Sequence, residues 1–82
     1  MSRRVVLYGL PACVQCKASA RKLDALGVAF EYVDLAADGE ALARVRALGH
    51  RQAPVVLVVD GGGREEAWSG HRPDRLDTLA AA

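Results

Sequence analysis

The chain has 82 residues, with 11 basic and 10 acidic side chains and a formal net charge of +1, which argues against nucleic acid or a membrane surface as its partner. Its length suits one domain of modest stability over residues 1–82, and its 51% apolar residues suffice for a core. The apolar runs are too short for a membrane span or a signal peptide. Two cysteines in a chain without a secretion signal fit a reducing cytosol, so we expect a cytoplasmic protein. We also expect a monomer.

Hydrophobic periodicity and turn residues divide the chain into seven predicted elements. Alternating or continuous β-branched residues predict strands, and apolar residues at steps of three or four predict helices. Glycine favours the conformation just beyond a helix end, and proline favours a helix start. In chain order we expect a strand at 3–8, a helix at 14–26, a strand at 29–35, a helix between Asp38 and Gly49, strands at 54–59 and 65–68, and a helix from Pro73.

The order of these elements, β-α-β-α-β-β-α, constrains the topology. The first β-α-β unit should be parallel and right-handed, and the Asp-Gly-Gly-Gly turn at 60–63 should make the last two strands antiparallel. Residues 54–59 should be buried on both faces. We expect an α/β fold with a four-stranded mixed sheet and helices on both faces, unlike the β-α-β-β-α-β order of ferredoxin-like metal chaperones. The inward positions of the second helix should be Ala41, Leu42, Val45 and Leu48.

The two cysteines, Cys13 and Cys16, lie at the turn from the first strand into the first helix. Their Cα atoms should be about 5 to 6 Å apart, which is within the range that a disulfide requires. A bond that closes so small a loop constrains the unfolded chain little. We therefore interpret the pair as a working dithiol and not as a structural staple.

The two sulfurs should not be equivalent. Cys16 begins an apolar stripe on the helix and should be buried. Cys13 lies at the helix tip, where unpaired backbone N–H groups, the helix dipole and the charge of Lys17 favour a thiolate. We predict that Cys13 attacks and Cys16 resolves. The stripe continues through Ala20, Leu23 and Leu26.

Two other interpretations of the cysteines are weaker. A pair of core cysteines does not explain the position after Pro11 at a helix start. A structural zinc site usually needs four ligands, and the chain has no third cysteine. Its histidines, His50 and His71, are not spaced as in a zinc finger. We therefore expect no metal site.

Three segments together resemble the NrdH-redoxins, glutaredoxin-like proteins of the thioredoxin-fold superfamily. They are residues 8–16 with Cys-Val-Gln-Cys, residues 49–56 with Gly-His-Arg-Gln-Ala-Pro-Val-Val, and residues 68–74 with Trp-Ser-Gly-His-Arg-Pro-Asp. The resemblance implies a thioredoxin fold of glutaredoxin size and a dithiol–disulfide oxidoreductase without a bound cofactor. It also implies electron donation to the large subunit of class Ib ribonucleotide reductase, and reduction by NADPH-dependent thioredoxin reductase.

The same resemblance implies roles outside the cysteine pair. Pro54 would be a cis-proline facing the disulfide, and the backbone of Ala53 would pair with a partner's extended chain. Alternatively, Pro54 only opens a strand. Residues 68–74 would form a hydrogen-bonded loop near the active site. Because this segment differs from the one with which ordinary glutaredoxins hold glutathione, the resemblance implies weak glutathione binding. Trp68 could equally be a core or edge-strand aromatic. Gln52, like Arg51, could also be a solvated loop residue. The candidate partner contacts are Gln52, Trp68, Ser69, Gly70 and Arg72.

The chain departs from the family pattern at three positions. Leu10 stands where Lys or Arg is usual, which removes a positive charge near Cys13. His50 and His71 stand where aromatic residues are usual, and we expect each at or near the surface. One hypothesis is that one of them titrates near the site and makes thiol exchange pH-dependent between about pH 6 and 7.

Two rival functions would use the same thiols. A glutathione-dependent glutaredoxin differs in its reductant. A metal or iron–sulfur carrier would hold its cargo on the cysteines, and metal content would reveal it.

Overall fold

The computed structural model describes residues 3–80 and contains the elements in the expected order. The ends of the expected domain, residues 1–2 and 81–82, lie outside this range. None of the helices within the described residues has the length and apolar character needed to cross a membrane. The elements are β1 (Arg4–Gly9), α1 (Val14–Ala25), β2 (Glu31–Asp34), α2 (Gly39–Ala47), β3 (Val55–Val59), β4 (Glu65–Ser69) and α3 (Pro73–Asp77).

The strands form one four-stranded sheet in the order β2-β1-β3-β4. β1 and β2 run parallel, with Leu7 opposite Tyr32. β3 runs antiparallel to both of its neighbours, with Tyr8 of β1 opposite Val55. The predicted mixed sheet is therefore confirmed, with the parallel pair and the antiparallel hairpin where the sequence placed them.

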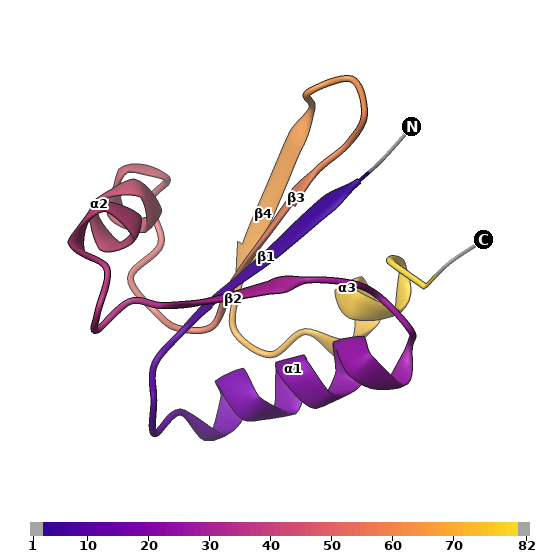
Figure 1. The fold of residues 1–82 in the computed structure, drawn as a ribbon, viewed down its shortest axis with the longest axis horizontal. Coiled ribbons are helices and arrows are strands. Elements are labelled where there is room, and N and C mark those ends of the chain that lie inside the picture. The colour runs from indigo at the N-terminus through magenta and orange to yellow at the C-terminus, as the bar shows by residue number, and fades with distance from the viewer. Residues whose placement is uncertain (1–2, 81–82) are drawn as a thin grey trace.

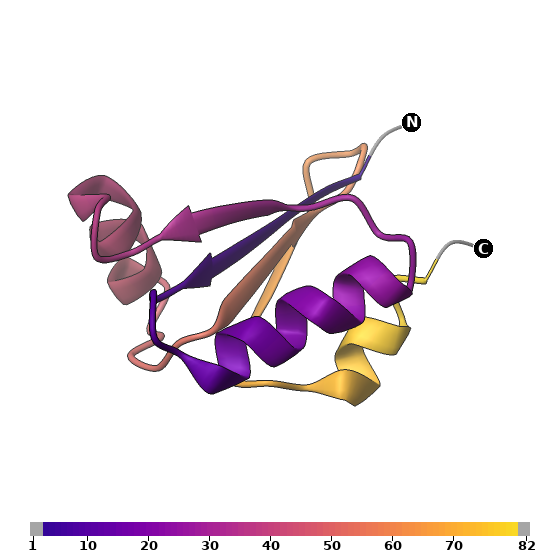
Figure 2. The ribbon, with the colours of Figure 1, turned by 60° about the horizontal axis from the view of Figure 1, so that its bottom comes forward.

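Helices cover both faces of the sheet: α1 and α3 lie on one face and α2 on the other (Figure 1; Figure 2). Because successive strand residues point to opposite faces, β1 and β3 contribute to both cores. The core under α1 and α3 contains Val5, Leu7, Leu23, Val28, Val56, Val58, Trp68, Leu76 and Leu79. The core under α2 contains Val6, Tyr8, Leu35, Ala41, Val45, Val55 and Leu57.

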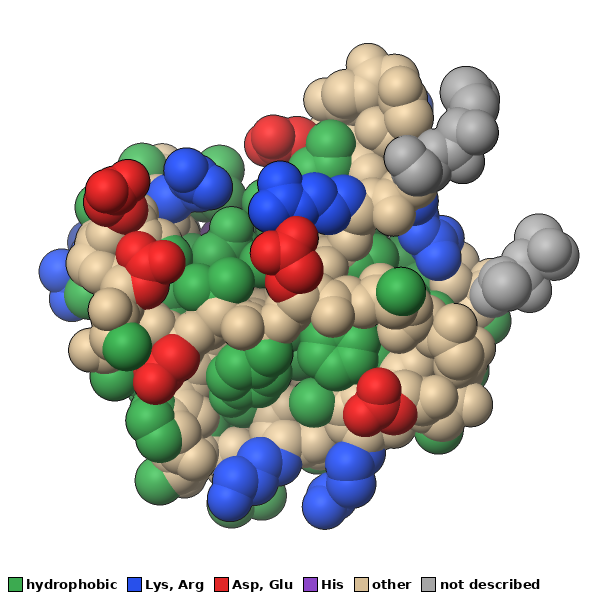
Figure 3. All heavy atoms as spheres, viewed as in Figure 1, with side chains coloured by type: hydrophobic (Ala, Val, Ile, Leu, Met, Phe, Trp, Pro, Cys, Tyr) green, Lys and Arg blue, Asp and Glu red, His purple; other side chains and the backbone are tan. Residues whose placement is uncertain are grey.

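Acidic and basic side chains are interspersed on the face seen in Figure 3. Arg4 and Glu31, for example, form an ion pair with 2.7 Å between Nε and Oε1. Their hydrogen bond raises the pKa of Arg4 and lowers the pKa of Glu31. Both side chains are more than half exposed, so this pair contributes little to stability.

A glycine marks the carboxyl end of α1. Gly27 follows α1 with φ of +71°, its N–H donates to Asp24 O, and the next N–H, of Val28, donates to Leu23 O. This is the hydrogen-bond pattern of a Schellman motif, and it explains why the helix stops there. At the amino end of α2, the Asp38 carboxylate accepts from the Ala41 N–H at 3.0 Å, as the predicted cap requires.

Two sequence expectations about these elements need correction. Leu48 is 43% exposed and not inward, because it follows the last turn of α2 and borders an open groove over β1 and β3. β2 is shorter than the predicted 29–35, since it pairs with β1 alone and only from Glu31 to Asp34. Neither change moves the cysteine end of the sheet.

Candidate redox site

Cys13 and Cys16 form a disulfide at the amino end of α1. Their Cα atoms are 5.1 Å apart, in agreement with the expected separation. Cys13 is the N-cap residue, with an extended backbone at φ −94° and ψ 112°, and Cys16 lies in the first turn of the helix. The predicted position of the pair, at a strand-to-helix turn, is confirmed.

The two sulfurs have unequal surroundings. Cys16 has no exposed surface, whereas Cys13 is half-buried. The backbone N–H of Cys16 donates to Cys13 Sγ over 3.1 Å. After reduction, this N–H and the dipole of α1 would favour a negative charge on Cys13. The geometry therefore supports attack by Cys13, with Cys16 lying beneath it.

The end of β1 fits closely under the disulfide. A Cβ atom at Gly9 would collide with the hydroxyl end of the Tyr32 side chain, which is 43% exposed, and would lie 3.2 Å from Cys16 Cβ, so a larger residue here would displace the Tyr32 ring and crowd Cys16. The Tyr32 hydroxyl donates to Leu10 O at 3.2 Å, and the same oxygen accepts from the Cys13 N–H at 3.4 Å. Burial, followed by the Asp34 carboxylate, raises the pKa of Tyr32. Our sequence reasoning missed this role of Tyr32, since only strand pairing brings residue 32 beside β1.

The peptide bond between Ala53 and Pro54 is cis, as the family resemblance implied. Pro54 is fully buried and directly precedes Val55, which lies opposite Tyr8. One further step along this antiparallel register leads to Pro54 and Gly9, the last residue of β1. Pro54 therefore lies at the cysteine end of the sheet, with half-buried Ala53 next to it.

The segment after β4 connects the proline loop to α1. Gly70 N–H donates to Pro54 O at 2.8 Å, and His71 N–H donates to Gln15 Oε1 at 3.3 Å. His71 Nδ1 also lies 2.7 Å from Ser19 Oγ. Ser19 is fully buried and escaped the sequence analysis, although its place one turn beyond the buried cysteine could have indicated it.

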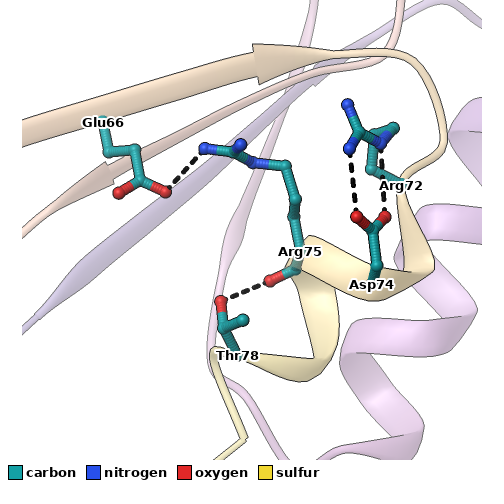
Figure 4. Close-up of polar contacts among 5 residues, drawn as sticks. All are labelled: Glu66, Arg72, Asp74, Arg75 and Thr78. Carbon is teal, nitrogen blue, oxygen red and sulfur yellow. Dashed lines mark hydrogen bonds and ion pairs between the residues drawn. The ribbon is translucent and has the colours of Figure 1, made fainter.

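Trp68 and Arg72, two candidate partner contacts, make intramolecular contacts instead of lying free. Trp68 is 5% exposed and belongs to the core under α1 and α3, with the Arg75 guanidinium 4.9 Å from its ring centre. Of the two interpretations left open for Trp68, the structure favours the core. Arg72 is exposed and donates twice to Asp74, at 3.2 and 3.0 Å (Figure 4). These hydrogen bonds raise the pKa of Arg72 and lower the pKa of Asp74.

The remaining predicted residues lie around the same end of the molecule. Lys17 is exposed, one turn after Cys13. Gln52 is exposed and Ser69 is half-buried. Gln52, Ala53 and half-buried His50 line a cavity of about 680 Å³ beside α2. Within residues 3–80, no group of three or more His, Cys, Asp or Glu side chains could hold a metal ion.

Comparison with known proteins connects this geometry to a family. A family model for glutaredoxin matches residues 5–62. The "Glutaredoxin-like protein NrdH" of Escherichia coli (strain K12) is 38% identical over 79 residues, covering 96% of this chain and 91% of the relative.

Solved structures agree with the sequence comparison. The glutaredoxin-like protein NrdH-redoxin from Escherichia coli superposes with a TM-score of 0.82 at 37% identity, over 96% of this chain and 97% of that one. A thioredoxin from Fasciola hepatica superposes with a TM-score of 0.75 at 26% identity, over 93% and 75% of the two chains. The predicted thioredoxin-like fold is therefore confirmed. The chain belongs to the glutaredoxin family and, within it, to the NrdH-redoxins, thiol–disulfide oxidoreductases whose redox-active pair is here Cys13 and Cys16.

Proposed function

We propose that this NrdH-redoxin passes electrons to the large subunit of class Ib ribonucleotide reductase and receives them from NADPH-dependent thioredoxin reductase. The observation that best supports this proposal is the disulfide at the tip of α1, with one half-buried and one fully buried cysteine. The similarity to NrdH proteins supports the choice of partners. We further propose that the protein works as a cytoplasmic monomer without a bound cofactor.

The exchange proceeds in two displacements. The Cys13 thiolate attacks one sulfur of the partner disulfide, and the other partner sulfur leaves as a thiolate. Cys16, once deprotonated, attacks Cys13 Sγ and releases the second partner sulfur. Two electrons have then moved to the partner, whose thiolates take up two protons. Thioredoxin reductase restores the Cys13–Cys16 dithiol with two electrons from NADPH.

The proline loop supplies the docking backbone in this proposal. Pro54 O already accepts from Gly70 N–H. Within residues 3–80, by contrast, the backbone N–H and C=O of Ala53 take part in no hydrogen bond, so both can pair with an extended partner chain. Gln52 and Ser69 are the contacts we propose beside it.

The remaining candidates take smaller parts. We propose that Gly70 and Arg72 form the partner-facing loop, that Trp68 supports this loop from the core, and that Lys17 favours the thiolate of Cys13.

The test compares electron sources in an NADPH-coupled assay that ends in deoxyribonucleotide formation by a class Ib reductase. We expect thioredoxin reductase to support turnover and glutathione with glutathione reductase to support little. Equal or faster turnover with glutathione would favour a glutathione-dependent glutaredoxin. Visible absorbance and bound metal in protein purified without oxygen would favour a metal or iron–sulfur carrier.

A further inference from the structure

We propose that Tyr32 is a positioning residue for thiol exchange: by holding the turn before α1, it keeps Cys13 where the Cys16 N–H stabilises its thiolate. The proposal concerns the exchange reaction itself, so it goes beyond the partner and reductant proposed above and does not depend on them. The sequence around the cysteines does not indicate this part of the site, because Tyr32 comes from another element, β2.

The Tyr32 side chain reaches the turn across a glycine. Leu7 of β1 lies opposite Tyr32, and side chains two residues apart along a strand point to the same face. Gly9 therefore leaves open the space where a side chain would stand, and the hydroxyl end of Tyr32 occupies that space. The same space borders Cys16 Cβ, so the Tyr32 hydroxyl lies beside the buried cysteine of the disulfide.

The hydroxyl adds a second hydrogen bond to the turn before α1. The turn runs from Leu10 to Cys13, with Pro11 at its second position, where proline is favoured. Leu10 O accepts from the Cys13 N–H at 3.4 Å and from the Tyr32 hydroxyl at 3.2 Å, and a carbonyl oxygen can accept both. Both bonds are longer than usual, so each contributes modestly and the carbonyl is held by the two together.

The position of Cys13 determines how well its sulfur is stabilised. Cys13 is the N-cap of α1, and its Sγ accepts from the Cys16 N–H at 3.1 Å. This bond requires the extended backbone of Cys13, with φ −94° and ψ 112°, which directly follows the turn. A looser turn would let Cys13 leave this conformation, and its thiolate would then lose the N–H that stabilises it. Loss of the Tyr32 hydroxyl should therefore make Cys13 harder to deprotonate.

Two features keep this donor available during exchange. Burial, followed by the Asp34 carboxylate, raises the pKa of Tyr32, so its hydroxyl keeps its proton over the range in which a thiol titrates. Neither hydrogen bond to Leu10 O involves a sulfur atom, so both can form in the oxidised and in the reduced protein. The positive charge of exposed Lys17, one turn after Cys13, is independent of this contact.

The experiment compares the reduced, full-length wild type with Tyr32→Phe and Tyr8→Phe. Tyr32→Phe keeps the ring and removes the donor, whereas the control Tyr8→Phe removes a hydroxyl from the core under α2, on the other face of the sheet. Iodoacetamide alkylation between about pH 5 and 9, with the label assigned to Cys13 by peptide mass spectrometry, gives the midpoint of deprotonation. We expect this midpoint to rise in Tyr32→Phe, with about 2- to 3-fold less thiolate at any pH below it, and to stay unchanged in Tyr8→Phe.

Exchange rates separate a positioning role from a purely structural one. The substrate is hydroxyethyl disulfide, a small neutral disulfide that needs neither a reductase nor a protein partner. Below the midpoint, Tyr32→Phe should react about 2- to 3-fold more slowly than the wild type. Well above it, the variant should be at least as fast, because a thiolate of higher pKa is intrinsically more nucleophilic. Tyr32→Leu, which also lacks the hydroxyl, should show the same pattern.

Four results would overturn the inference, one of them together with the exchange chemistry. An unchanged midpoint in both Tyr32 variants would show that the hydroxyl does not position Cys13, and would leave thiol exchange intact. A rate lowered by the same factor at every pH would make the contribution of Tyr32 purely structural. An equal rise of the midpoint in Tyr8→Phe would assign the effect to a general loosening of the sheet. Failure of the wild type to reduce hydroxyethyl disulfide would overturn the dithiol chemistry and this inference together.

Discussion

At the scale of single residues, reactivity depends on the unequal burial of two sulfurs that are bonded to each other. Cys13 is half-buried and accepts from the Cys16 N–H, and Cys16 has no exposed surface. A fully buried sulfur cannot meet a protein disulfide first. It can, however, reach Cys13 once a mixed disulfide has formed, and this order of events can be tested.

Replacement of each cysteine should have a different effect. Cys13→Ser should abolish reduction of a partner disulfide, whereas Cys16→Ser should stop after the first displacement and accumulate a mixed disulfide. Mass spectrometry of the trapped species measures this, and iodoacetamide labelling against pH should show Cys13 reacting at lower pH than Cys16. If Cys16 were alkylated at the lower pH, the assignment would be reversed.

Gly9→Ala should destabilise the protein, because the added methyl group meets the Tyr32 hydroxyl and Cys16 Cβ. The cost should be about 0.5–1.5 kcal/mol, because exposed Tyr32 can turn away at the loss of its hydrogen bond to Leu10 O, and urea unfolding measures it. Gly39→Ala is the matched control, since a Cβ at Gly39 would have no neighbour within 4 Å. An equal effect of the two changes would contradict the close packing under the disulfide.

At the scale of elements, the site depends on the segment from β4 to α3. Its backbone N–H groups at Gly70 and His71 donate to the proline loop and to α1, so three parts of the chain hold one another in place. The His71 ring adds a bond to buried Ser19, one turn beyond Cys16. A change in this segment can therefore reach the cysteines without touching them.

The hypothesis that His50 or His71 makes thiol exchange pH-dependent concerns contacts between elements, and it stays a prediction. The double variant His50→Phe/His71→Phe tests it, because a phenyl ring has no ionisable group. Pre-steady-state reduction of a small disulfide at each pH provides the measurement. The single variants show whether His71, at Ser19, or His50, at the cavity beside α2, is responsible. An unchanged pH profile in the double variant would rule the hypothesis out.

The start of α3 should respond to acid through Asp74. The hydrogen bonds from Arg72 lower the pKa of Asp74 below its ordinary 3.8, so their stabilisation is complete above that pH and is lost as pH falls through the lower, folded-state pKa. Melting temperature should therefore fall less in Asp74→Asn than in the wild type below about pH 4. The effect should be small because the pair is exposed. Asp24→Asn is the control, and an identical response in both variants would contradict this assignment.

At the scale of the whole molecule, stability comes from the two apolar cores and not from the disulfide. Each face of the sheet has its own buried cluster, and the central strands β1 and β3 contribute to both. The disulfide joins residues only 3 apart in sequence. A protein built in this way can cycle between oxidised and reduced states while its fold stays the same.

Reduction of the disulfide should lower the free energy of unfolding by no more than about 2 kcal/mol, because so short a loop restricts the unfolded chain little. Urea unfolding with and without dithiothreitol, followed by the fluorescence of buried Trp68, provides the comparison. Unfolding on reduction alone would show instead that the bond is a structural staple.

The sequence by itself determined the order of elements, the helix ends and the cysteine pair. These depend on local physics: apolar periodicity marks buried faces, Gly27 marks a helix end, and spacing fixes the Cys13–Cys16 separation at 5.1 Å. The cis bond before Pro54 could be expected only from family resemblance, since an X-Pro bond without tertiary context favours the trans form.

Only the tertiary structure decided which distant residues meet at the disulfide. Tyr32 reaches Gly9 through parallel pairing, Ser19 meets His71 across 52 positions, and Trp68 turned out to lie in the core. The cavity beside α2 likewise combines residues from α2, the proline loop and the segments that follow β1 and β2. The reason is physical: periodicity shows that a side chain is buried, but which partner it meets depends on how the sheet and helices pack.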